Sequence, residues 1–332
     1  MKVRVISESE FTVQGHGVHT AYFELTNALK QVDGVEVIVN QRGKVDVTHF
    51  HTVGMYSLLY LLFGSGKKVV SAHVVPESFV GSLVGTKYWL PLATMYLRWF
   101  YNHADLVLAV SDKTKEDLEK LSVTKPIVVF HNVIDTSRYL AHPGDRQSAR
   151  KALGLTPEGI IVISAGQVQP RKRVDSFIKT AKALPEITFI WVGGMPFGKA
   201  AAQSGKMERM IRTSPPNVIF PGILPLEKMR DYYHAANIFM LPSDQETFGL
   251  VVVEAAAAGL PIVLRDIPDY DETFRVDSVM SSETGFARAI QKLVTDKKYY
   301  YDMQNHAGQI AARFDSRAGA KKIVQYYREL LG

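Results

Sequence analysis

Short apolar runs alternate with helical patterns along almost the whole chain, and this alternation is the feature that most limits the possible folds. Six such runs precede a polar, turn-rich break at 136–148, and five follow it. They are 3–7, 35–39, 44–50, 68–73, 105–111 and 126–132, then 159–166, 187–194, 217–222, 237–243 and 260–266. Strands that alternate with helices build parallel, doubly wound sheets. The sequence therefore predicts an α/β chain with two Rossmann-like domains.

The composition is that of a globular chain. Its 332 residues are 46% hydrophobic and 22% charged, which is enough for two separate cores. The absence of cysteine excludes disulfides, thiolate metal sites and cysteine nucleophiles. The N-terminal stretch lacks the apolar core of a signal peptide, and the most apolar run, 53–64, is too short to span a bilayer. We therefore expect neither export nor a transmembrane helix.

The net charge of +6 would suit nucleic acid or an anionic membrane surface. Residues 1–145 carry equal numbers of basic and acidic side chains, so the whole excess lies in the remainder of the chain. No continuous basic stripe follows from this distribution. We expect no nucleic-acid partner.

A glycine pair stands where the first strand leads into the first helical pattern. Gly15, His16 and Gly17 follow that strand, and Thr20 stands where the third glycine of a dinucleotide fingerprint would be. Glycine lets a ligand approach the main chain, and a helix start offers unpaired N–H groups to an anion. A tight turn without a ligand explains the pattern equally well.

The segment 243–266 carries the densest chemical signal. An apolar strand ends at Pro242, a loop presents Glu246, and a helix predicted to begin near Phe248 carries Glu254. The first N–H groups of that helix, at the positive end of its dipole, would face a phosphate held between the two carboxylates. The alternative is a buried helix between two solvated glutamates.

This segment resembles the E-x7-E signature of the retaining glycosyltransferases of family 4, which have the GT-B fold of two doubly wound domains facing across a cleft. Other stretches resemble the same family: 15–17, 71–73, 131–135, 166–175, 191–194, 220–222 and 255–263. The resemblance implies a first domain over 1–140 on the acceptor and membrane side. It implies a nucleotide-sugar domain over 148–314 and a C-terminal helix over 315–332 that packs back on the first domain.

The resemblance also implies roles for single residues. The catalytic residues would be His73, Glu246 and Lys172, with Glu246 on the donor hexose, Glu254 on the ribose and His73 on the donor sugar or acceptor. The donor-binding residues would be Gly15, His16, Gly17, Arg171, Lys172, Ile223, Leu224, Thr247, Phe248, Gly249, Leu250, Val251 and Glu254. The glycine loop would close over the nucleotide, Ile223 and Leu224 would lie along the base, and the backbone at 248–251 would take the diphosphate.

The family usually adds an arginine to the diphosphate site, and this chain departs from that pattern. Gln167 stands at the arginine position, so either Arg171 or Arg173 supplies the charge. We expect no cofactor and no metal, since fixed cations and helix-start amides can stabilise a departing nucleoside diphosphate. The D-x-D at 269–271 and the two histidines of the run 49–51 are the weaker metal candidates. For the histidines, which share one face of a strand, packing is the favoured interpretation.

Two features bear on the acceptor. Residues 79–101 are rich in aromatics and carry only Lys87 and Arg98 as charges, which suits either a membrane boundary or a core helix pair. The N-terminal run 7–22 resembles bacterial glycosyl-diacylglycerol glycosyltransferases. That resemblance implies transfer of glucose or galactose from a UDP-hexose to monohexosyl-diacylglycerol, which gives the diglycosyl lipid that anchors lipoteichoic acid. It also implies a cytoplasmic enzyme attached peripherally to the inner face of the cell membrane.

Three other functions remain open on the sequence. The acceptor could be a soluble sugar or a polysaccharide primer, with the same donor chemistry. A UDP-sugar epimerase of similar fold would isomerise the UDP-sugar without any acceptor. A non-catalytic protein would only bind the nucleotide sugar. Retention by front-face attack, with the departing phosphate assisting proton removal from the acceptor, is implied by the resemblance alone.

Overall fold

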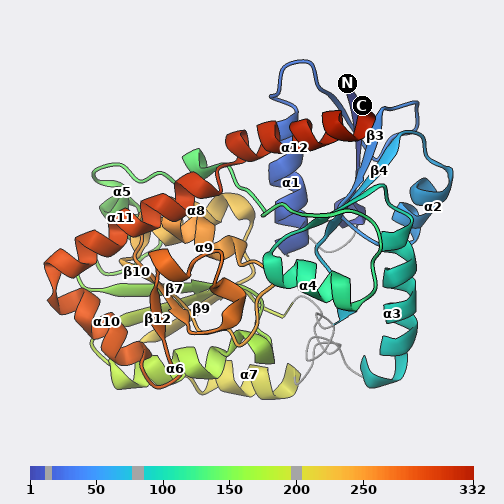
Figure 1. Ribbon diagram of the computed structural model, residues 1–332. Coiled ribbons are helices and arrows are strands. Elements are labelled where there is room, and N and C mark those ends of the chain that lie inside the picture. The colour runs from blue at the N-terminus through green and yellow to red at the C-terminus, as the bar shows by residue number, and fades with distance from the viewer. Residues whose placement is uncertain (12–16, 77–85, 196–203) are drawn as a thin grey trace. The chain divides into compact units, whose positions relative to one another are not determined.

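The computed structural model describes residues 1–11, 17–76, 86–195 and 204–332 (Figure 1). They form two compact units. The first contains the described residues up to 135 together with 314–332, and the second contains the described residues from 136 to 313. Gly15 and His16 of the glycine loop lie outside the described residues. The predicted helix after this loop is α1, Gly17–Leu29.

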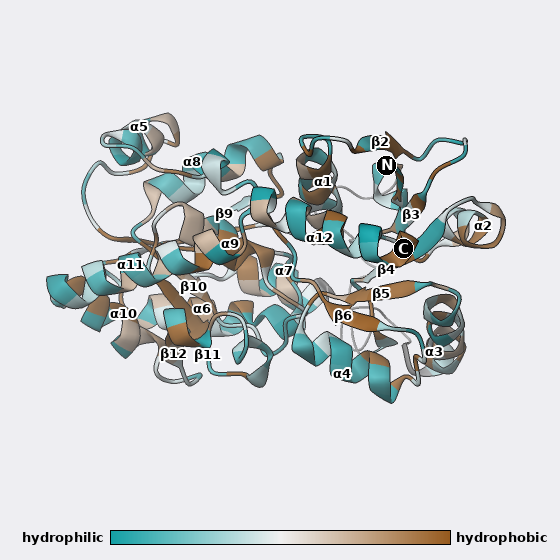
Figure 2. Cartoon of the chain, turned by 45° about the horizontal axis from the view of Figure 1, so that its top comes forward, coloured by the Kyte–Doolittle hydropathy of each residue, from teal (hydrophilic) through white to brown (hydrophobic). Residues whose placement is uncertain are grey.

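Unit 1 is built on a parallel six-stranded sheet of order β2-β1-β3-β4-β5-β6. Its strands are β1 Lys2–Ile6, β2 Glu36–Val39, β3 Val47–Phe50, β4 Lys67–Ala72, β5 Leu106–Ala109 and β6 Ile127–Val129. Its other helices are α2 Met55–Phe63, α3 Thr86–Asn102, α4 Asp112–Lys120 and α12 Ser316–Leu331. Figure 2 shows β5 and β6 as apolar strands beside the mostly polar α4. Parallel strands covered on both faces require such continuous apolar runs.

The C-terminal helix α12 packs against α1, as Figure 1 shows. Ile323, Val324 and Tyr327 of α12 are buried in one core cluster with residues of β1 and α1. The helix is capped by Asp315, whose carboxylate accepts a hydrogen bond of 3.0 Å from the N–H of Arg317. A side chain at Gly319 would meet Val133 at 2.6 Å, so the absence of a β-carbon allows the close approach. The last helix therefore completes the core of unit 1.

Unit 2 has a second parallel sheet, of order β12-β11-β10-β7-β8-β9. Its strands are β7 Ile161–Ala165, β8 Thr188–Val192, β9 Val218–Gly222, β10 Ile238–Leu241, β11 Ile262–Arg265 and β12 Val279–Ser281. Its helices are α5 Asp145–Ala152, α6 Val174–Ala183, α7 Ser204–Arg212, α8 Leu226–Ala235, α9 Leu250–Ala257, α10 Phe286–Thr295 and α11 Lys297–Arg313. The sequence did not predict β12, because this edge strand has only three residues and no apolar run. The predicted doubly wound α/β architecture is otherwise confirmed.

The strand order locates where each sheet should bind a ligand. In doubly wound sheets the ligand lies at the carboxyl ends of the two strands where the direction of winding reverses. These strands are β1 and β3 in unit 1 and β7 and β10 in unit 2. In unit 2 the loops at that point are 166–173 and 242–249. No helix among the described residues is long and apolar enough to cross a membrane.

Candidate active site

The two loops at the winding reversal of unit 2 bring a lysine and a glutamate together. Lys172 ends the 3-10 turn Pro170–Lys172 after β7, and Glu246 lies in the loop after β10. The Lys172 Nζ is 2.5 Å from the Glu246 Oε1, although 74 positions separate the two residues. Their side chains are only 10% and 5% exposed. Two of the three predicted catalytic residues thus form a buried ion pair.

Burial and pairing act in opposite directions on the Glu246 carboxyl. Burial raises its pKa, but the charges of Lys172 and Arg171 outweigh burial, so its pKa lies below the ordinary value. Burial also lowers the pKa of Lys172, and the Glu246 carboxylate only partly compensates. The site therefore holds an ionised carboxylate beside a lysine whose ammonium depends on that carboxylate.

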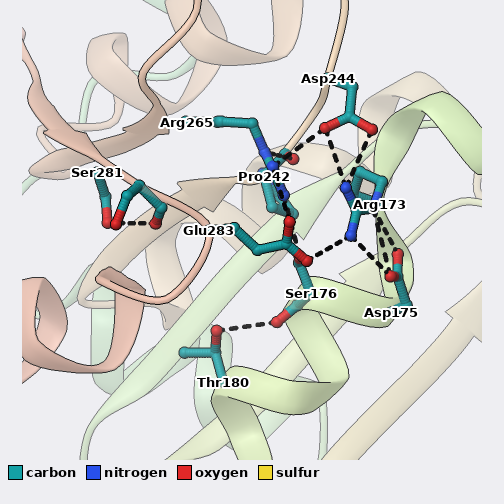
Figure 3. A network of polar contacts seen from close by, with 10 residues as sticks. Arg173, Asp175, Ser176, Thr180, Pro242, Asp244, Arg265, Ser281 and Glu283 are labelled. Atoms are coloured by element: carbon teal, nitrogen blue, oxygen red, sulfur yellow. Dashed lines mark hydrogen bonds and ion pairs between the residues drawn. The ribbon is translucent and has the colours of Figure 1, made fainter.

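The structure separates the two candidate arginines. The Arg171 Nη1 donates to the carbonyl of Gln245 at 3.2 Å and is 3.9 Å from the Glu246 Oε2. Arg173 instead pairs with Asp175, Asp244 and Glu283 (Figure 3). Arg171 is therefore the arginine that lies beside the ion pair.

The network in Figure 3 ties the two active-site loops together, and no pattern in the sequence predicted it. Arg173 has φ of 52°, a left-handed conformation that is rare without glycine, and its guanidinium reaches three carboxylates. Arg265, at the end of β11, donates to the carbonyl of Pro242 at 2.7 Å and lies 3.1 Å from Asp244. The carboxylates raise the pKa of Arg173, with the hydrogen bond to Asp175 as the largest cause. The network therefore fixes both loops that carry the ion pair.

The helix that follows Glu246 begins later than predicted. Gly249 has φ of 98° and forms the N-cap, so α9 starts at Leu250 and not near Phe248. Phe248 and Leu250 are buried, whereas Thr247, Gly249 and Val251 are partly exposed. The first turn of a helix leaves backbone N–H groups without helical partners. Those of α9 come four residues after Glu246.

Glu254 lies within α9 and is buried. Its Oε2 accepts a hydrogen bond of 2.8 Å from the hydroxyl of Tyr233, a fully buried residue of α8. Tyr233 could not be predicted from the sequence, because nothing in its spacing of 21 positions from Glu254 indicates the contact. The predicted base-binding residues follow β9, where Ile223 is 55% exposed and Leu224 is partly buried.

In unit 1 the predicted cleft histidine, His73, follows β4 and is buried. Its Nε2 lies 3.2 Å from the Nδ1 of His51, which follows β3, and the two rings are stacked. His49 and His51 do share one face, with ring centroids 4.4 Å apart. The sequence predicted the pair on β3 but did not connect it with His73.

Known family models match both units of the chain. Residues 145–310 match the family model of glycosyl transferases group 1, and residues 36–138 match that of glycosyltransferase family 4. A relative from Streptococcus pneumoniae, an alpha-galactosylglucosyldiacylglycerol synthase, is 35% identical over 278 residues, which cover 81% of this chain and 74% of the relative. The chain belongs to glycosyltransferase family 4.

Other matches extend the comparison. A processive diacylglycerol alpha-glucosyltransferase from Acholeplasma laidlawii is 28% identical over 298 residues, which cover 89% of this chain and 88% of the relative. The solved structure of sucrose-phosphate synthase from Thermosynechococcus elongatus has a TM-score of 0.82 at 17% identity and covers 99% of this chain and 98% of its own. Anabaena HepE in complex with UDP-glucose has a TM-score of 0.79 at 19% identity and covers 99% and 100%. These structures identify the fold as GT-B, as predicted.

Both aspartates of the D-x-D at 269–271 are paired with other groups of this glycosyltransferase. Asp269 accepts a hydrogen bond of 2.7 Å from the backbone N–H of Glu246, and Asp271 pairs with Arg275 at 2.6 Å. Asp269 thus helps to hold the loop that carries Glu246. Within the described ranges no three His, Asp or Glu side chains are arranged to hold a metal ion.

The aromatic segment of the glycosyltransferase has two different faces. Of residues 79–101, the structure describes 86–101, which belong to α3. Leu97, Phe100 and Tyr101 are buried in the core of unit 1. Four apolar residues on another face are exposed by 38% to 77%: Tyr88, Leu92, Met95 and Trp99. Core packing and an exposed apolar stripe therefore occur on the same helix.

Proposed function

We propose that this glycosyltransferase transfers glucose or galactose from a UDP-hexose to monohexosyl-diacylglycerol at a membrane surface, with retention of the anomeric configuration. The observation that carries the proposal is the buried pair of Lys172 and Glu246 at the winding reversal of unit 2. An ion pair costs desolvation energy there, so its presence favours a chemical role. The two relatives that act on diacylglycerol lipids support the choice of acceptor.

The donor site follows from the charges around the pair. The UDP diphosphate gains negative charge as its bond to the hexose breaks, and preorganised donors stabilise that charge. Lys172, Arg171 and the first N–H groups of α9 are the donors near this point. Glu246 then binds hydroxyls of the hexose, and Glu254 binds those of the ribose. No metal is required for this step.

Further donor contacts are proposed on the family pattern. Ile223 and Leu224 lie along the uracil base, which the exposure of Ile223 supports. Gly15, His16 and Gly17 are proposed as further nucleotide ligands, and His73 as a ligand of the donor hexose. Retention proceeds by front-face attack, in which the departing phosphate takes the acceptor proton. The names of both relatives specify alpha products, which from an alpha-linked UDP-hexose requires retention.

A lipid acceptor requires contact with a membrane, and two helices of unit 1 offer a surface for it. In α2 the exposed apolar residues recur at helical spacing: Met55, Leu59, Leu62 and Phe63. The exposed stripe of α3 has the same kind of spacing, and both helices pack into one core cluster of unit 1. Paired exposed apolar stripes are unusual on a water-soluble surface. They support peripheral attachment to a membrane, and we propose its cytoplasmic face as the site.

The test is a panel of donors and acceptors. UDP-glucose and UDP-galactose are each offered with diacylglycerol, monohexosyl-diacylglycerol in detergent, and free glucose, and the products are identified by mass spectrometry. We expect one added hexose on the monohexosyl lipid. Glycosylation of the free sugar alone would favour a soluble acceptor, and interconversion of the two UDP-hexoses without an acceptor would identify an epimerase. Either result would overturn the proposal.

A further inference from the structure

Three buried histidines lie together at the ends of β3 and β4, and the proposed mechanism uses only one of them. The ring of His49 has both nitrogens engaged. Its Nε2 lies 2.8 Å from the hydroxyl of Ser71, and its Nδ1 lies 2.7 Å from the hydroxyl of Tyr327 in α12. Burial lowers the pKa of His49 to about 3, so the ring is neutral at physiological pH.

His51 makes a different set of contacts. Its Nδ1 lies 3.2 Å from the Nε2 of His73, while its own Nε2 is buried and has no hydrogen-bond partner in the described part of the chain. Burial, and to a smaller extent the neighbouring histidines, lower the pKa of His51 well below the ordinary value. The His51 ring is therefore neutral and carries a single N–H.

Two arrangements of the shared proton are possible. If His73 donated from its Nε2, the N–H of His51 would have to lie on the orphaned Nε2. A buried N–H without an acceptor is costly and rare in folded proteins. The rings of Tyr22 and His49 beside His51 could accept only a weak N–H···π contact. If His51 instead donates from its Nδ1 to the Nε2 of His73, the Nε2 of His51 carries only a lone pair and no unsatisfied N–H.

We propose that His51 is a positioning residue that donates from its Nδ1 to the Nε2 of His73 and thereby holds His73 in the Nδ1–H form. In a neutral imidazole, the hydrogen bond made by one nitrogen decides which nitrogen carries the proton. The proton of His73 then lies on its Nδ1, so this nitrogen is a donor and not a base. The inference rests on the proposed function for the statement that this N–H meets an oxygen of the donor hexose.

The tautomer can be measured directly on the whole enzyme. Protein labelled with 15N in its histidines is examined by long-range 15N–1H correlation, and the variant His73→Gln identifies the signals of His73. We expect a protonated Nδ1 and a bare Nε2 on His73 in the wild type. A proton on Nε2 would overturn the proposal. The spectrum is recorded without substrate, so it decides the tautomer whichever donor and acceptor the enzyme uses.

Two variants of His51 test the role of the hydrogen bond. His51→Leu removes the donor, so His73 should shift toward the Nε2–H form, and kcat for transfer should fall about tenfold, as for the loss of one hydrogen bond. The KM for the UDP-hexose should change less than about twofold. His51→Asn places an amide N–H near the former Nδ1, so it should keep the wild-type tautomer and most of kcat. An unchanged His73 spectrum in His51→Leu would overturn the proposal.

A matched control separates positioning from packing. Tyr327→Phe removes the hydroxyl that contacts His49 and leaves the contact between His51 and His73 intact. It should lower stability without changing the tautomer of His73. If Tyr327→Phe shifted the tautomer as strongly as His51→Leu, the hydrogen bond from His51 would not be its cause.

Discussion

The variant Glu246→Gln should destabilise unit 2 by about 3–5 kcal/mol, because it leaves the buried ammonium of Lys172 without its counter-charge. At an effective dielectric constant of about 20, Coulomb's law gives an attraction on the order of 7 kcal/mol for unit charges 2.5 Å apart. The cost of burying the two charges offsets much of this attraction in the wild type. The variant keeps the size of the side chain and the cost of burying the lysine but loses the attraction.

The assay needs a signal from unit 2 alone, because a chain of two units need not unfold in one step. The chain has three tryptophans, of which Trp191 is buried in unit 2 while Trp89 and Trp99 lie in α3. In a background with Trp89→Phe and Trp99→Phe, urea unfolding followed by fluorescence reports on unit 2. The free energy of unfolding is compared between that background and the same background carrying Glu246→Gln.

An exposed ion pair in the same unit is the matched control. Asp271 and Arg275 are 2.6 Å apart, almost the same separation, but their side chains are 52% and 36% exposed. Asp271→Asn should cost less than about 1 kcal/mol, as exposed pairs do. If Glu246→Gln cost no more than Asp271→Asn, the pair with Lys172 would behave as a solvated contact, and the reasoning from burial would be refuted.

Three further predictions concern binding, membranes and pH. Glu254→Ala should weaken UDP binding by about 10- to 100-fold in calorimetry. Glu246→Ala should instead abolish transfer and change the affinity for UDP little. Small, equal effects of the two variants would contradict both roles. Phe63→Ser and Met95→Ser should each reduce liposome binding by about tenfold or more, given the apolar surface removed, and a loss of circular dichroism instead would indicate a core role. Because the pKa of Glu246 in the folded chain is lowered from its unfolded value of 4.5, the ionised carboxylate stabilises the fold at pH values above 4.5. The free energy of unfolding should therefore decrease below about pH 5, as the carboxylate is protonated. Glu246→Gln should make that fall shallower, and an equally steep fall in urea midpoint would count against the assignment.

Much of the fold was predictable because buried parallel strands are continuous apolar runs. Eleven of the described strands were expected at their observed places, and only β12 among them was missed. The spacing of Glu246 and Glu254 likewise identified the segment that follows β10. The start of α9 was predicted two residues early because the left-handed conformation of Gly249 is not visible in an apolar pattern.

The contacts of the site were less predictable than its residues. Lys172 and Glu246 come from loops 74 positions apart, and only the strand order brings the loops together. Arg171 and not Arg173 lies beside Glu246 because Arg173 pairs with other carboxylates far along the chain. The pairing of His51 with His73 depends on the neighbouring positions of β3 and β4 in the sheet. Such contacts arise from tertiary geometry, which sequence spacing does not encode.

The return of α12 to unit 1 has a consequence for the order of folding during synthesis. Unit 2 is contained within the described residues from 136 to 313, so its chain is complete before α12 is translated. The core of unit 1 is incomplete until Ile323 and Tyr327 have been synthesised. Until then the apolar side chains of α1 and β1 that pack against them are exposed on the nascent chain. The unit that is translated first therefore completes its core last, and its exposed apolar surface is prone to aggregation until then.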